Sequence, residues 1–161
     1  MSEKTMLFIH ALTGLHPGSG TALGVVDLPV QRERHTQWPV IPGSSLKGVV
    51  RDACTRGSGG KSDEIFAAFG PETINADAHA GALSFTDARI LAFPVRSLRG
   101  VFGWVTCPAV LERLKRDLSL VGEKDSLSWK TPTAAGKALC VKGSPLVVDN
   151  DKIVLEEFDF T

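Results

Sequence analysis

Lys47 and Arg51 are two cations four residues apart, directly after a stretch that is typical of a helix start. A Pro-Gly pair breaks the preceding structure, and Ser44 or Ser45 could cap the first free amides of the helix. At this spacing both cations lie on one helix face, and a helix N-terminus favours a phosphate. The stretch therefore indicates a phosphate-binding helix start. An ordinary amphipathic helix whose cations face water is equally consistent with the spacing.

Gly48 lies in the middle of this expected helix. Glycine there costs roughly 1 kcal/mol of helix propensity relative to alanine. The cost is understandable if another group packs closely against the backbone at that point. A phosphodiester backbone is one candidate for that group.

Asp27 and His16 are the two upstream residues that could take part in catalysis. His16 lies at the exit of an expected strand, beside a glycine-rich turn where the backbone can approach a ligand closely. Asp27 lies within residues 21–42, which show no periodic element, and such a long irregular stretch in a compact domain is usually functional. An aspartate that precedes a Leu-Pro pair can also form an Asx turn or cap a helix. On the residues alone, both roles for Asp27 stay open.

Arg32, Arg34 and His35 form a charged cluster in the same irregular stretch. Their side chains could hold phosphates or orient the Asp27 carboxylate. Trp38 could stack on a nucleobase, and a role as an anchor of the loop is equally consistent with its position. We therefore expect binding residues in this loop.

The net charge of the 161-residue chain is zero, but the charges are unevenly distributed. Residues 32–61 hold six Lys and Arg against two acids, and residues 89–116 hold six against one. Residues 62–88 hold five acids and no Lys or Arg. Phosphate binding depends on local contacts, so a neutral total does not exclude a nucleic-acid partner.

The composition limits the classes of protein to which the chain can belong. An apolar content of 43% is enough for one buried core. No run reaches the roughly 18 apolar residues of a membrane span, and the N-terminus lacks a signal-peptide pattern, so we expect a cytoplasmic protein without membrane contact. Cys54, Cys107 and Cys140 are far apart with no C-x-x-C pair, which argues against a disulfide framework or a zinc site. We expect them to be small core residues.

The elements that must position these residues follow from periodicity and turn residues. Strands are expected at 5–15, 83–95, 101–106, 138–141, 145–148 and 153–160. Helices are expected from Ser44 to about Arg51, at 63–69 and at 107–120, the last with Arg113 on its polar face. Residues 61–82 otherwise form a loop or insertion, and residues 121–152 are mostly irregular. This order predicts one α+β domain over residues 1–161, a ferredoxin-like (RRM-like) sandwich with long functional loops.

Two long segments carry a family resemblance. The first contains H-x-G-S-G, V-V-D-L-P-V-Q-R-E-R-H-T and P-x-x-P-G-S-S-L-K-G-V-V-R, and the second runs from Ser84 to Pro108. In this order they resemble the RAMP superfamily of CRISPR effector proteins, and most of all the repeating backbone subunit of the type III-B, or Cmr, complex. Family members are considerably longer, so the chain is similar to an N-terminal or truncated portion.

The resemblance implies a subunit that binds a CRISPR guide RNA and assembles with other copies of itself and with other Cmr subunits. It also implies endoribonuclease activity on complementary single-stranded target RNA. Asp27 matches the family's catalytic aspartate, and a single carboxylate fits a water-rich Mg²⁺ or Mn²⁺ site shared with phosphate oxygens. His16 matches a guide-contacting position and could instead assist proton transfer. The residues expected to contact RNA are Lys47, Arg51, Ser44, Ser45, Arg32 and Arg34.

Two other functions stay open. One is a non-catalytic RNA-binding scaffold in which Asp27 only orders its loop. The other is a protein assembly module whose basic blocks are solvated faces. The chain has no tyrosine and lacks the aromatic signature of RNA-recognition motifs, so we do not expect bases to be read on a sheet face.

Overall fold

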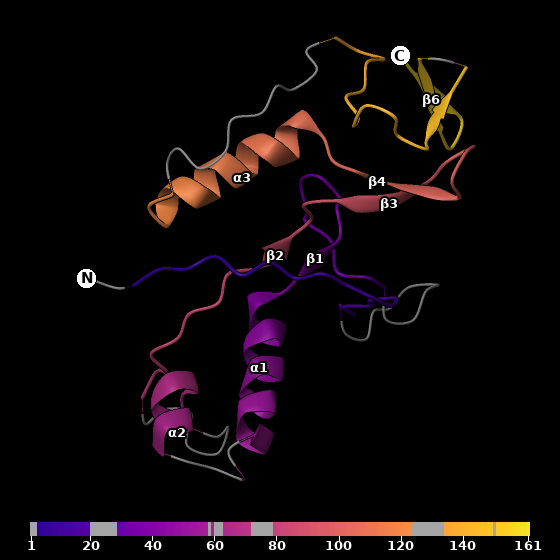
Figure 1. Cartoon of the computed structure of the whole chain (residues 1–161). Coiled ribbons are helices and arrows are strands. Elements are labelled where there is room, and N and C mark those ends of the chain that lie inside the picture. The colour runs from indigo at the N-terminus through magenta and orange to yellow at the C-terminus, as the bar shows by residue number, and fades with distance from the viewer. Residues whose placement is uncertain are drawn as a thin grey trace. The chain divides into compact units, whose positions relative to one another are not determined.

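The computed structural model describes residues 3–19, 29–57, 59, 63–71, 79–123, 134–149 and 151–161. Within these ranges the chain forms three helices and seven short strands, labelled in Figure 1. They are divided between two compact units, Ile9–Arg89 and Met1–Phe8 with Ile90–Thr161. The expected α+β class is confirmed. Within the described ranges, no helix has both the length and the apolar character needed to cross a bilayer.

The unit Ile9–Arg89 is built on two helices and one short strand pair. Strand β1 (Val40–Ile41) pairs antiparallel with β2 (Ala88–Arg89), which places Val40 opposite Arg89. Helix α1 (Gly43–Gly57) follows β1 directly, and α2 (Asp63–Phe69) packs beside it (Figure 1). The buried apolar residues here are Val40, Ile65 and Phe69. The short helix expected at 63–69 is confirmed, because α2 has these bounds.

The start of α1 differs from the prediction. The helix begins at Gly43, whose amide donates to Asp87 Oδ1 at 2.8 Å. A side chain at position 43 would collide with the backbone of Phe85, so glycine is required for this close approach. The expected cap by Ser44 or Ser45 is wrong, because both serines lie inside the helix and a distant carboxylate takes that place.

The second unit combines a hairpin, a helix and a small sheet. Strands β3 (Phe93–Arg96) and β4 (Phe102–Val105) form an antiparallel hairpin, and α3 (Pro108–Leu120) follows with proline in its first turn. Strands β5 (Val147–Val148), β6 (Lys152–Leu155) and β7 (Phe158–Phe160) form an antiparallel sheet in that order. Val110, Leu118 and Ile153 are buried. The expected helix at 107–120 and strand at 101–106 are confirmed.

Several expected strands are wrong. No described residue between 3 and 15 belongs to a strand, and Leu7, Phe8 and Leu12 are exposed. Alternating apolar residues form a strand only where a neighbouring strand supplies hydrogen-bond partners, and no described ladder includes this stretch. Residues 138–141 also contain no strand.

Two other expected strands are interrupted. Residues 83–95 contain β2 and the start of β3 instead of one continuous strand. Residues 153–160 form the β6–β7 hairpin, which turns at Glu156 with a backbone φ of 51°. Across the described residues the strands make three separate small sheets.

Two predictions about burial are also wrong. Arg113 is only 9% exposed, because it lies three residues after the buried Val110 and therefore on the same side of α3. Cys54 and Cys140 are exposed and Cys107 is half-buried, so none of the three is a core residue.

Candidate functional site

Lys47 and Arg51 lie on one face of α1, as their spacing predicted. Lys47 Nζ donates to the Leu83 carbonyl oxygen at 2.9 Å, and Arg51 Nη1 donates to the Pro71 carbonyl oxygen at 3.1 Å. The two cations therefore fasten the segments on either side of residues 72–78 to the helix. An ammonium carries three N–H donors and a guanidinium five, so each side chain has donor capacity beyond its bond to the carbonyl oxygen.

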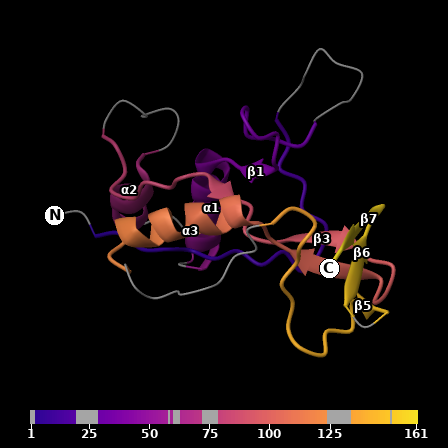
Figure 2. The same ribbon diagram turned by 90° about the horizontal axis from the view of Figure 1, so that it is seen from above.

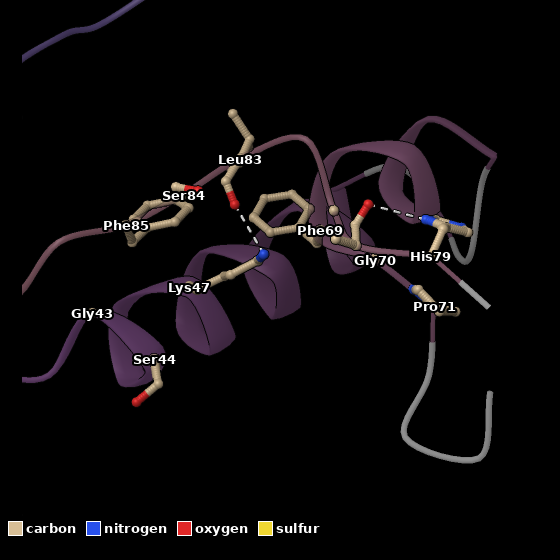
Figure 3. Close-up of a pocket in the computed structure, with 12 residues that line it drawn as sticks. Gly43, Ser44, Lys47, Phe69, Gly70, Pro71, His79, Leu83, Ser84 and Phe85 are labelled. Carbon is tan, nitrogen blue, oxygen red and sulfur yellow. Dashed lines mark hydrogen bonds between the residues drawn. The ribbon is translucent and has the colours of Figure 1, made fainter. Parts of the chain in front are cut away.

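An open depression of about 480 Å³ lies along this face of α1. Its lining includes Ser44, Lys47, Phe69, His79 and Phe85. The Phe69 and Phe85 rings are stacked with centroids 6.4 Å apart, and Figure 3 shows the Lys47 side chain running past them to Leu83. An ammonium beside aromatic rings can bind the phosphate of a ligand while a flat group of the same ligand lies against the rings.

A second depression, of about 570 Å³, brings together two segments that are far apart in sequence. The pairing of β1 with β2 places residues 31–35 beside residues 86–89. The ionisable residues that line it are Arg32, Glu33, Arg34, His35, Asp87 and Arg89. Three arginines against two carboxylates make this depression suitable for an anion.

Both carboxylates in this second depression have partners within the protein. Glu33 Oε2 accepts from Thr36 Oγ1 at 2.5 Å and lies 3.8 Å from His35 Nε2. Asp87 Oδ1 accepts from the Gly43 amide. Arg32 also contributes to the order of this loop, since its Nη1 donates to the Gln37 carbonyl oxygen at 2.7 Å.

The predicted site residues do not gather in one place. Ser44 and Lys47 share the first depression, and Arg32 and Arg34 share the second, whereas Ser45 and Arg51 line neither. His16 is exposed and lies in neither a helix nor a strand. Asp27 lies outside the described residues. Among the residues that are described, no three His, Cys, Asp or Glu side chains converge to hold a metal ion.

The structure adds residues that the sequence did not single out. His79 and Phe85 line the first depression, while Asp87 and Arg89 line the second. Asp87 and Arg89 belong to the second family-like segment, so a signal was present, but their pairing with β1 was not visible from local sequence. His79 lies in a stretch of small and acidic residues that gave no signal.

A family profile described as "RAMP superfamily" matches residues 8–158. The chain belongs to the RAMP superfamily. The RAMP protein named "CRISPR system Cmr endoribonuclease Cmr4" from Pyrococcus furiosus is 49% identical over 150 residues, which are 93% of this chain and 50% of that relative. The resemblance seen in the motifs is thus confirmed.

Two solved structures are similar to this chain. The crystal structure of oligomeric Cmr4 from Pyrococcus furiosus superposes with a TM-score of 0.73 at 42% identity, covering 92% of this chain and 51% of that one. The cryo-EM structure of the type III-B Cmr-beta bound to cognate target RNA contains a chain with a TM-score of 0.58 at 28% identity, covering 74% and 44%. The chain spans about half the length of the curated relative and of the Pyrococcus structure that it matches.

Proposed function

We propose that this RAMP protein acts in the backbone subunit of a type III-B CRISPR effector complex. The subunit binds a guide RNA and cleaves complementary single-stranded target RNA. Its partners are the guide, the target, further copies of the same chain and other Cmr subunits. The observation that carries this proposal is the 49% identity to a named Cmr endoribonuclease along almost the whole chain.

The two depressions of the unit Ile9–Arg89 support RNA binding. One offers Lys47 and Ser44, and the other offers Arg32, Arg34 and Arg89. Arginine and lysine contacts to phosphates hold an RNA backbone in position without reading its sequence. In this proposal sequence choice belongs to base pairing with the guide.

The finer fold is part of the same proposal. The α+β elements of this chain form part of a ferredoxin-like, RRM-like palm. The TM-score of 0.73 to the oligomeric Cmr4 structure supports this assignment.

Cleavage is assigned to Asp27 with a divalent cation, Mg²⁺ or Mn²⁺. A lone carboxylate suits a hard cation that takes its other ligands from water and phosphate oxygens. Such an ion, when bound, stabilises negative charge at the scissile phosphate. Asp27 would hold the ion, and His16 would either contact the guide or move a proton.

Replacement of Asp27 by Asn tests this function. Asp27→Asn keeps the shape and much of the hydrogen bonding of an Asx turn but removes the negative charge. The variant is assembled with its partner subunits, and gel shifts confirm that it still binds guide and target. Labelled target RNA is then followed with Mg²⁺, with Mn²⁺ and with EDTA.

We expect the Asn variant to bind RNA normally and to lose cleavage. Normal cutting by this variant would remove Asp27 from the mechanism and leave the scaffold function. Wild-type cleavage that persists in EDTA would exclude the metal.

A further inference from the structure

The β3–β4 hairpin has two faces of different character. In its antiparallel register, Arg96 is opposite Phe102 and Pro94 is opposite Trp104. Residues directly opposite each other in such a pair point to the same side of the sheet. These four residues therefore share one face, which we call the aromatic face.

The other face of the hairpin is covered from within its own unit around Gly103, whereas Phe93 on that face is 49% exposed. Gly103 is buried, and a Cβ atom added there would lie 2.7 Å from Leu146 Cδ1. The segment that contains Leu146 thus packs directly on the strand backbone.

The two rings of the aromatic face are accessible. Phe102 is 48% exposed and Trp104 is 53% exposed. Their centroids are 6.1 Å apart and the rings are inclined at 80°, an edge-to-face arrangement. Flat apolar surface is therefore presented to solvent in a defined geometry.

The hairpin is held firmly at its closed end. Leu98 N donates to the Val154 carbonyl oxygen at 3.1 Å, and Ser97 Oγ donates to the same oxygen at 3.2 Å. Arg99 Nη1 donates to the Val147 carbonyl oxygen at 2.8 Å. Figure 2 shows this end of β3–β4 beside the β5–β6–β7 sheet. A surface fixed in this way loses little further freedom when a ligand binds.

Two arginines and one glutamate lie at the aromatic face and its turn. Arg96 lies on the face, Arg99 lies in the turn, and both are exposed. The Glu156 carboxylate accepts from the Arg96 backbone amide at 3.3 Å, so one negative charge lies beside the two cations. Exposed aromatic rings next to cations are the combination used by proteins that bind single-stranded nucleic acids.

We propose that the aromatic face binds single-stranded RNA, with bases stacked on Phe102 and Trp104 and Arg96 at the adjoining phosphates. The proposal rests on the RNA-binding function above and adds the place where bases, not phosphates, are held. It agrees with the expectation from sequence that no base is read on a sheet face, because stacking does not distinguish one base from another. Stacking tolerates any base, so this site adds affinity without sequence preference.

The test compares RNA with and without bases. Fluorescence anisotropy measures binding of the 161-residue chain to a labelled oligouridylate and to an abasic oligomer of equal length and charge. We expect the wild type to bind the oligouridylate at least about 5-fold more tightly. Phe102→Leu combined with Trp104→Leu should remove this difference while leaving the weaker abasic binding unchanged.

Two control variants separate stacking from folding. Phe158→Leu changes another exposed aromatic residue of the same unit, 63% exposed on β7, and should keep the full base dependence. Trp104→Phe keeps a flat ring on β4 and should keep most of it. Circular dichroism establishes that each variant is folded.

Three results would overturn the proposal. If the double-leucine variant retains its base dependence, the protein binds RNA but its bases do not stack on the aromatic face. A double-leucine variant whose RNA binding is unchanged but whose oligomeric size differs by light scattering makes the face a protein interface. Failure of the wild type to bind either oligomer rejects the proposed RNA-binding function as well.

Discussion

The Asp87 carboxylate accepts a 2.8 Å hydrogen bond from the Gly43 amide, joining residues 44 positions apart in sequence. This amide is the first of α1, where the helix carries a partial positive charge. A carboxylate of the protein therefore takes one of the amides at which the sequence indicated a phosphate.

Removal of the Asp87 cap should destabilise the protein. We expect Asp87→Ala to lower the free energy of unfolding by about 1 kcal/mol, as is usual when a helix cap is removed. Asp87→Asn keeps an acceptor and should cost less. Urea denaturation measures both, with Asp52→Ala as the control, because Asp52 forms an exposed ion pair with Arg56 and should matter by less than about 0.5 kcal/mol. Equal losses for Asp87→Ala and Asp52→Ala would contradict a capping role.

Two glycines of α1 should respond to alanine in opposite ways. A side chain at position 48 would meet nothing within 4 Å, so Gly48→Ala should stabilise the protein by about 0.5–1 kcal/mol. Gly43→Ala should destabilise it, because the new methyl group collides with the Phe85 backbone. Thermal unfolding distinguishes the two directions. Gly48→Ala also tests whether RNA packs against this glycine. If RNA does so, the variant should be more stable and should bind RNA more weakly.

Charge reversal at Lys47 or Arg51 should weaken guide-RNA binding by a similar factor for every guide sequence, because phosphate contacts carry no sequence information. Arg56→Glu is the matched control on the same helix, since Arg56 is exposed and paired with Asp52. Filter binding with two unrelated guides over a range of salt is the measurement. Removal of one phosphate contact should reduce the slope of log K against log salt concentration by about 0.7.

The Lys47 and Arg51 result has two informative alternatives. Weaker binding to only one of the two guides would speak against phosphate contacts. Little wild-type binding at any salt would favour the assembly module. Because both side chains also hold carbonyl groups, the unfolding temperature of each variant is measured alongside.

Local sequence patterns predicted the helices that depend on residues close together in the chain. Proline in its first turn and an apolar stripe predicted α3, and flanking turn residues predicted α2. The spacing of Lys47 and Arg51 placed both on one face of α1. Strand 5–15 failed because a strand depends on its neighbour, which local alternation cannot reveal.

The site could be predicted only in part for a similar reason. Motifs made Lys47, Arg32 and Arg34 candidates because those residues lie in family-like segments, and each of them lines one of the two depressions. The role of Asp87 and the position of Arg89 depend on the pairing of β1 with β2, which joins residues almost 50 positions apart. Periodicity within a short window contains no information on such a pairing.

The close backbone contacts of residues 79–87 have a consequence for synthesis on the ribosome. Gly81 leaves no room for a side chain against Phe69 and Gly70, and Phe85 and Asp87 hold the start of α1. Chains fold from the N-terminus as they emerge. Helix α1 therefore leaves the ribosome uncapped, and the unit Ile9–Arg89 can close only after Asp87 has been translated.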